Sequence, residues 1–164
     1  MGQQDLKSKS KTPLNYAERL SKIEGFCAYQ ERCAWEVRNK LREWQTPETE
    51  AESIIAELIQ QNFLNEERYA RAFAGGKFRI KKWGWKKIKF ELVKREISSY
   101  CLLQAQKEID AEQYLQVLKD VLSEKARGLK NKSALQRKAL LVNYAVSRGF
   151  EADLALQVLG TTEN

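Results

Sequence analysis

Cations and aromatic rings alternate in one short segment of this 164-residue chain. Between Gly75 and Arg95 there are nine Lys and Arg residues and one acid, Glu91, so the segment has a net charge of +8 where the whole chain has +7. Cations neutralise phosphates and aromatic rings stack on bases, so this mixture is typical of nucleic-acid-binding surfaces, and it also fits an acidic protein face. The cations are Lys77, Arg79, Lys81, Lys82, Lys86, Lys87, Lys89, Lys94 and Arg95, and the rings are Phe78, Trp83, Trp85 and Phe90.

The same segment has a second interpretation, as an ordinary amphipathic helix whose rings point inward and whose cations lie in solvent. Ile88 and Leu92 are one helical turn apart, so one side of a helix here must be buried. Charge alone does not decide between the two interpretations.

Residues for catalysis or metal binding are not grouped in this sequence. Histidine is absent, and the three cysteines, Cys27, Cys33 and Cys101, show no CxxC spacing. The acids are spread along predicted helices, and Gly75-Gly76 lacks the pattern of a phosphate-binding loop. We therefore expect a protein that is not an enzyme, with reduced core thiols, no cofactor and no metal site.

The composition favours helices. The chain has 43% hydrophobic and 31% charged residues but only two prolines, which is typical of a mostly helical globular protein. We find no apolar run near the roughly 18 residues of a membrane span and no signal peptide, so we expect a cytoplasmic protein. Residues 1–11 are polar and basic and are predicted to be a disordered tail.

Apolar residues recur at helical spacing, and the pattern itself recurs along the chain. A first stripe falls at Tyr16, Leu20, Ile23 and Cys27, and a second falls at Ala34, Val37, Leu41 and Trp44. A third helix is predicted from Pro47 to about Gln61. About 50 residues later the stripes return at Tyr69, Phe73, Gly76 and Ile80, and then at Trp85, Ile88 and Leu92.

A third copy of the pattern starts at Asp110, where Tyr114, Leu118 and Val121 repeat the spacing of the first helix. The pattern predicts an all-α fold, an elongated and curved array of three tandem three-helix repeats. The expected limits are 12–64, 65–109 and 110–160, and the alternative is a single globular bundle with chance Tyr matches.

Pro and Gly mark the predicted breaks. Thr12-Pro13 and Thr46-Pro47 are predicted to start helices, with Thr as the cap and Pro in the first turn. Asn65 is predicted to cap the fourth helix. Gly75-Gly76 inside that helix favours close approach of another helix, and Trp83-Gly84-Trp85 is predicted to turn the chain into the next helix.

Two strings in the middle segment form an ordered pair: residues 63–73, Phe-Leu-Asn-Glu-Glu-Arg-Tyr-Ala-Arg-Ala-Phe, and residues 82–92, Lys-Trp-Gly-Trp-Lys-Lys-Ile-Lys-Phe-Glu-Leu. In this order they resemble the two parts of the central motif of the RecX family of bacterial recombination regulators. A looser resemblance covers 14–160 and includes Arg148-Gly149-Phe150. The chain departs from the family at Gly75-Gly76 and in having Lys rather than Arg after Trp85.

The resemblance implies a regulator that binds the RecA recombinase and its nucleoprotein filament. Such a protein would negatively modulate ATP hydrolysis, strand exchange and co-protease activity, and so regulate DNA repair, recombination and the SOS response. We expect a monomer with no membrane partner that binds single- or double-stranded DNA non-specifically. The residues expected to contact RecA or DNA are Arg68, Arg71, Lys77, Arg79, Lys81, Lys82, Trp83, Trp85, Lys86, Lys87 and Lys89.

A different class of function is a plain helical-repeat DNA-binding protein. A reader of base sequence needs Asn, Gln or Arg on one helix, whereas the helix after Trp85 offers mostly Lys, which neutralises phosphate without reading sequence. Any DNA binding should therefore be non-specific and fall with salt.

Overall fold

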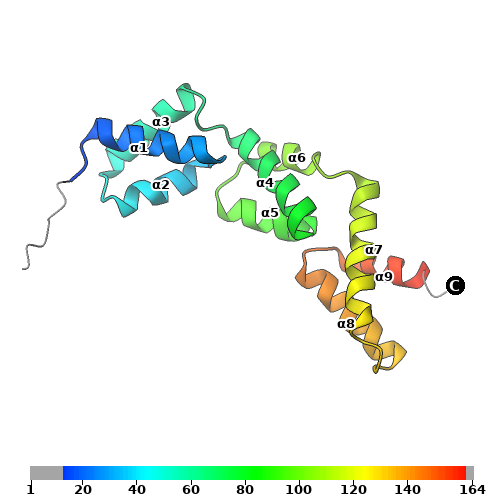
Figure 1. Ribbon diagram of the computed structural model, residues 1–164. Helices are drawn as coiled ribbons and strands as arrows, with labels where there is room; N and C mark the ends of the chain where they lie inside the picture. Colours follow the sequence, from blue (N-terminus) through cyan, green and yellow to red (C-terminus); the bar gives the residue numbers. More distant parts are fainter. Residues whose placement is uncertain (1–12, 162–164) are drawn as a thin grey trace, which may run out of the picture.

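The computed structural model describes residues 13–161, and the regular structure in that range is entirely α-helical (Figure 1). The predicted basic tail, 1–11, lies outside the described residues. No helix between residues 13 and 161 combines the length and apolarity needed to cross a bilayer. The helices of this range are α1 Tyr16–Tyr29, α2 Ala34–Glu43, α3 Glu48–Gln60, α4 Glu66–Lys81, α5 Trp85–Lys94, α6 Ser99–Gln106, α7 Ala111–Arg127, α8 Ala134–Ser147 and α9 Ala152–Thr161.

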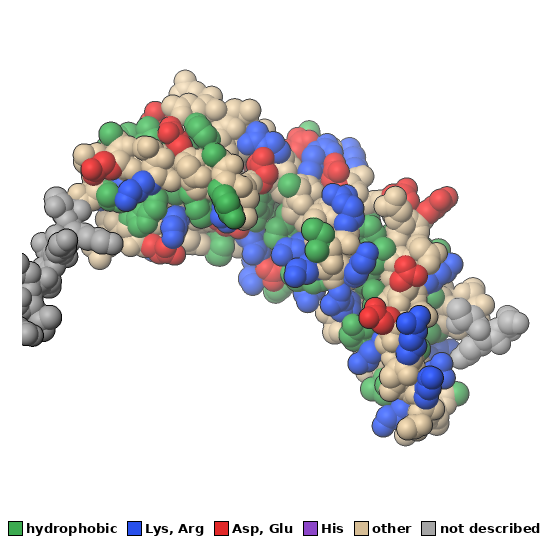
Figure 2. Space-filling view, in the orientation of Figure 1, with side chains coloured by type: hydrophobic (Ala, Val, Ile, Leu, Met, Phe, Trp, Pro, Cys, Tyr) green, Lys and Arg blue, Asp and Glu red, His purple; other side chains and the backbone are tan. Residues whose placement is uncertain are grey.

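The helices form three units in a row: α1–α3, α4–α6 and α7–α9 (Figure 1). Helices pack mainly against helices of their own unit, and each unit has its own apolar core. The row bends between its ends, so the molecule is elongated and curved (Figure 2). The predicted all-α array of three-helix units is confirmed, while the residue limits expected for the repeats stay a prediction.

The first unit buries the middle of the predicted stripes, while Tyr16 is exposed and Leu20, Ala34 and Trp44 are half-buried. Ile23 and Cys27 of α1 meet Val37 and Leu41 of α2 in one core. Below them Arg19 is also buried, and its Nη1 pairs with Oε1 of Glu50 on α3 at 2.7 Å. Burial of a charge is tolerated here because the partner carboxylate lies in hydrogen-bond contact.

In the second unit the predicted face of α4 is right at Tyr69, which is buried, and wrong toward the end of the helix. Ile80 was expected inside but is 77% exposed, while Ala70, Ala74 and Phe78 are buried. Small side chains explain the difference, because Ala70 and Ala74 let α4 lie close against Ala105 and its neighbours on α6. The apolar positions expected on α4 were those of α1 shifted along the chain. However, α4 packs much more extensively on α6 than α1 packs on α3, so the two helices do not bury the same face.

The expected helix starts are partly corrected. The N-cap of α1 is Asn15, whose side chain accepts a hydrogen bond from the N–H of Glu18, so Pro13 precedes the helix and Thr12 lies outside the described residues. Pro47 is itself the N-cap of α3, and Thr46 makes no cap bond. Asn65 caps α4 as predicted, accepting from the N–H of Arg68.

Side chains and ion pairs join the first unit to the second. Cys33, at the start of α2, is buried in the core of the second unit. The Tyr69 hydroxyl on α4 donates to Oε1 of Glu36 on α2 at 3.2 Å. Burial raises the pKa of Tyr69, so the hydroxyl stays a donor at any physiological pH.

Backbone contact joins the second unit to the third. Gly84, in the α4–α5 turn, donates its N–H to the carbonyl of Arg148 at 2.8 Å, and Lys86 donates to the carbonyl of Gly149 at 3.0 Å. A Cβ on Gly84 would lie 2.3 Å from the carbonyl carbon of Gly149. The close approach predicted at Gly75-Gly76 is therefore found at Gly84, and Gly76 has open space where a Cβ would be.

The tyrosine at the start of α7 completes this joint. The Tyr114 hydroxyl accepts from the N–H of Trp85 at 2.9 Å and donates to Oε2 of Glu151 at 2.8 Å. Its ring lies between Phe78 of the second unit and Phe150 of the third, at centroid distances of 5.8 and 5.1 Å. One side chain thus contacts both cores.

Candidate partner-binding surface

The turn at residues 82–84 places the cations of α4 beside those of α5. Lys82 adopts a left-handed conformation with φ of 55°, and its N–H donates to the carbonyl of Phe78, which ends α4. Gly84 is the N-cap of α5. The predicted turn at Trp83-Gly84-Trp85 is confirmed, and it brings the last turn of α4 and the first of α5 together.

Seven cations around this turn form a surface on the second unit that we call the central basic surface. In the described part of the chain none of the seven has a carboxylate within ion-pair distance, although Lys40, Lys94 and five arginines do. Unpaired cations retain their full attraction for an external anion. The members are Lys77, Arg79, Lys81, Lys82, Lys86, Lys87 and Lys89.

Trp83 lies among these cations. Its indole is half-buried against the second core, and the ammonium groups of Lys77 and Lys87 lie 5.0 and 4.5 Å from its ring. Cation–π contact holds two long side chains near one ring, which concentrates charge there. The structure thus brings Trp83, Lys77 and Lys87 together.

Trp85 has a different environment. Its ring packs against the second core and lines a cleft of about 460 Å³ with Ile109, Leu115 and Leu154. This cleft lies between the second and third units. Both tryptophans therefore pack against the second core, and Trp85 in addition lines this cleft.

The structure places Arg68 and Arg71 in internal ion pairs. Arg68 Nε pairs with Glu31 Oε1 at 2.6 Å, across the joint between the first two units. Arg71 Nη1 pairs with Glu108 Oε1 at 2.6 Å, which ties α4 to the end of α6. Both guanidiniums are therefore occupied, and their role toward a partner stays a prediction.

Two residues near the surface were not among those expected to contact RecA or DNA. Phe90 of α5 is 62% exposed between the cations, with the Lys94 ammonium 5.6 Å from its ring. Arg148 donates from Nη2 to the carbonyls of Lys81 and Lys82, so it stabilises the end of α4 from the third unit. In the sequence, Arg148 stood out only as part of Arg148-Gly149-Phe150, which belongs to the looser resemblance to the RecX family.

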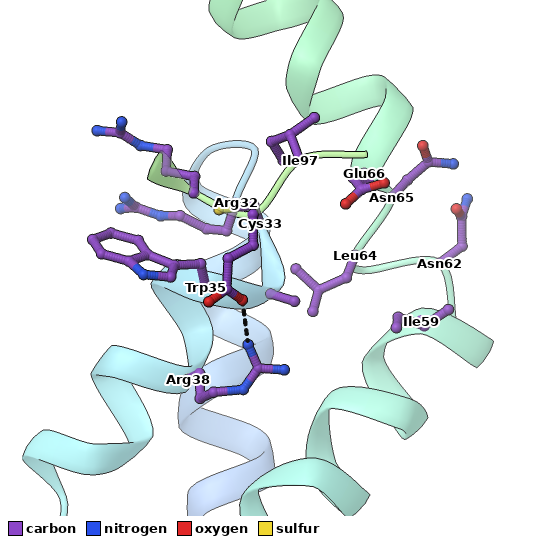
Figure 3. Close-up of a pocket in the computed structure, with 13 residues that line it drawn as sticks. Arg32, Cys33, Trp35, Arg38, Ile59, Asn62, Leu64, Asn65, Glu66 and Ile97 are labelled. Atoms are coloured by element: carbon purple, nitrogen blue, oxygen red, sulfur yellow. Dashed lines mark hydrogen bonds and ion pairs between the residues drawn. The ribbon is translucent and has the colours of Figure 1, made fainter. Parts of the chain in front are cut away.

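A cleft of about 570 Å³ lies at the joint between the first two units (Figure 3). Arg32 and Trp35 lie on one side of it, and Leu64 and Asn65 lie on the other. Arg38 Nη1 reaches Glu96 Oε2 at 3.5 Å across the joint. Residues of both units therefore line this cleft, which exists only where the two units meet.

Clustered metal ligands and exposed thiols are not found in the described part of the chain. Within residues 13–161 there is no cluster of three or more acids or cysteines that could hold a metal ion. All three thiols are buried and free, and desolvation raises the pKa of Cys27 to about 11. Buried, protonated thiols are poor nucleophiles.

The fold and the central basic surface together define a class of protein: all-α proteins built from tandem three-helix units, with a basic middle unit. A model of the RecX second three-helix domain matches residues 65–105. The regulatory protein RecX of Clostridium acetobutylicum is 29% identical over 140 residues, which is 83% of this chain and 64% of that protein. That of Clostridium beijerinckii is 28% identical over 126 residues, 76% of this chain and 58% of the relative. The chain belongs to the RecX family.

Solved structures agree with the fold. A crystal structure of RecX from Lactobacillus salivarius superposes with a TM-score of 0.79 and 20% identity, covering 90% of this chain and 96% of that one. A second crystal structure, of regulatory protein RecX, gives a TM-score of 0.81 with 20% identity, over 88% of this chain and 71% of that one. The chain spans about three fifths of the length of the curated relatives it matches.

Proposed function

We propose that this protein binds the RecA recombinase and its nucleoprotein filament and acts as a regulator without catalysing a reaction. In this proposal it restrains ATP hydrolysis, strand exchange and co-protease activity, and so regulates DNA repair, recombination and the SOS response. Membership of a family whose relatives are named regulatory proteins supports the role. We propose that it acts in the cytoplasm, as a monomer.

The observation that carries the proposal is the central basic surface. Seven cations without a carboxylate partner lie on the unit that the family model matches, and two of them, Lys77 and Lys87, contact the ring of Trp83. A filament offers both acidic protein and phosphate, and this surface can bind either by charge complementarity. Binding of this kind requires no catalytic group.

The shape suggests how binding would restrain turnover. A curved row of units fits the groove of a helical filament, with successive units against successive subunits (Figure 1). Contacts across two subunits hold them in one relative position, and a rearrangement that turnover requires is then opposed by the binding energy.

The test is the single-stranded-DNA-dependent ATP hydrolysis of RecA from the same bacterium, measured against increasing amounts of this protein. The test variant reverses three exposed charges of the central basic surface: Lys82→Glu, Lys86→Glu and Lys89→Glu. We expect wild-type protein to inhibit well below one copy per RecA, and the variant to need about tenfold more protein or beyond.

A charge-matched control keeps net charge from explaining the result. It reverses three exposed lysines outside the central basic surface, Lys22→Glu, Lys107→Glu and Lys119→Glu, and should inhibit nearly as wild type does. If hydrolysis is unchanged with DNA in excess, or falls only in proportion to the DNA sequestered, the filament proposal is wrong.

A second candidate function is non-specific DNA binding by a helical-repeat protein. The unpaired, mostly Lys composition of the central basic surface favours it, because Lys neutralises phosphate without base readout. Both candidates predict DNA affinity that falls with salt, so only the RecA measurement separates them.

A further inference from the structure

A second group of cations lies on the third unit, away from the central basic surface. From residue 125 to residue 150 the sequence has seven Lys and Arg residues and no acid. Six of them surround the turn between α7 and α8, and we call these the distal basic surface. They are Lys125, Arg127, Lys130, Lys132, Arg137 and Lys138.

These six side chains are available to an external ligand. Five are exposed and Lys138 is half-buried. In the part of the chain that the structure describes, none of the six has an ion-pair partner, and Lys125 lies 4.9 Å from the ring of Tyr144. Figure 2 shows Lys and Arg side chains gathered over the middle of the molecule and along the lower arm.

The helix dipole accounts for only two of these cations. Lys125 and Arg127 are in the last turn of α7, where positive charge is favourable. The other four lie around the N-terminus of α8, and Arg137 and Lys138 follow its first turn, which has no acid. Cations at a helix N-terminus oppose its dipole, so folding of this chain alone gives no reason for this arrangement.

A bound anion would offset the unfavourable interaction between these cations and the dipole of α8. The N-terminus of α8 is capped by Ser133, whose side chain accepts from the N–H of Gln136, but its dipole still favours negative charge and four cations surround it. Gly128 and Asn131 in the turn add no negative charge. The combination of dipole and unpaired cations points to a ligand with several negative groups.

The kind of polyanion follows from the side chains. Four of the six cations are Lys, which protein interfaces tend to exclude in favour of aromatic residues and Arg. Leu129 in the turn packs against the third core, so the large apolar side chain most exposed here is Leu135 in the first turn of α8, which is 81% exposed. A protein partner would need a larger apolar centre, whereas a phosphate backbone needs only distributed charge.

We propose that the distal basic surface is a second, sequence-independent binding site for the phosphate backbone of nucleic acid. The Gly84–Gly149 contact and the hydrogen bonds of Arg148 to the carbonyls of Lys81 and Lys82 join it to the central basic surface. The two surfaces therefore lie on units in direct backbone contact. The inference concerns the third unit and does not depend on RecA.

The experiment measures binding of a fluorescein-labelled oligothymidine by anisotropy, without RecA, over a series of salt concentrations. The test variant is Lys130→Glu, Lys132→Glu and Arg137→Glu, and a second variant replaces the same residues with Gln. We expect Kd to rise about tenfold or more for the Glu variant and less for the Gln variant. Each lost phosphate contact lowers the log–log salt slope by about 0.7, so three contacts lower it by about 2.

The matched control is again the triple reversal Lys22→Glu, Lys107→Glu and Lys119→Glu, which changes net charge equally. All the altered side chains are exposed, so helical content and thermal midpoint should stay as in wild type. Equal Kd and equal slope for the Glu variant and the control overturn the proposal. If DNA binding is intact but inhibition of RecA is lost, the surface contacts protein, and the nucleic-acid assignment is wrong.

Discussion

At the scale of single residues, two glycines set the relation between the second and third units. Gly149 has φ of +95°, a conformation that L-residues rarely adopt, and a Cβ there would lie 2.3 Å from the Cβ of Lys87. Gly84 faces it with equally little room. Without side chains at both positions the two turns can exchange backbone hydrogen bonds, which is why the Trp-Gly-Trp turn and the Arg-Gly-Phe turn meet.

This contact predicts opposite effects for two Gly-to-Ala substitutions. Gly149→Ala should lower the free energy of unfolding by about 2 kcal/mol or more, because it combines backbone strain with a clash against Lys87. Gly76→Ala, inside α4 with open space around it, should raise the free energy of unfolding by about 0.5–1 kcal/mol. Urea denaturation followed by circular dichroism measures both, and a Gly149→Ala protein as stable as wild type would contradict the structure.

At the scale of helices, the sequence predicted the elements better than their faces. The Tyr-based stripe located α1, α4 and α7 as helices, because helical periodicity is local information. The stripe on α4 was wrong at Ile80, because Ala70 and Ala74 turn the helix toward α6, and that packing is a long-range property.

The same distinction applies to the candidate site. The basic character of the segment from 77 to 89 is visible in the sequence, and the structure leaves those cations without internal ion pairs. Arg68 and Arg71 look equivalent in sequence, yet Glu31 and Glu108 pair with them from 37 residues away. Ion-pair partners that lie so far apart in the sequence can be identified only once the fold is known.

The tyrosines at the starts of α1 and α7 allow a test of the joint between units. Tyr114→Phe removes both hydrogen bonds of the hydroxyl and leaves the N–H of Trp85 without its acceptor, so we expect a loss of about 1–3 kcal/mol in the free energy of unfolding. Tyr16→Phe removes only an exposed bond to Glu57 and should change it by about 0.5 kcal/mol or less. Thermal and urea denaturation of both variants would show whether Tyr114 joins two units, and equal effects would contradict that role.

At the scale of the whole molecule, charge and shape act together. The first unit has more acids than cations, whereas the second and third have the central and distal basic surfaces. Each unit has its own core, and two different joints connect the units. Side chains and ion pairs join the first unit to the second, and backbone contact together with the Tyr114 side chain joins the second to the third.

The elongated shape gives the last prediction. A compact chain of this length has a radius of gyration of about 15 Å, whereas a curved row of three units should have one clearly larger, about 20 Å or more. Small-angle X-ray scattering at low protein concentration and moderate salt measures it, and the pair-distance distribution should be skewed toward long distances. A radius near 15 Å would mean that the outer units fold onto the middle one. The central and distal basic surfaces would then have to be placed anew, since their positions depend on the extended row.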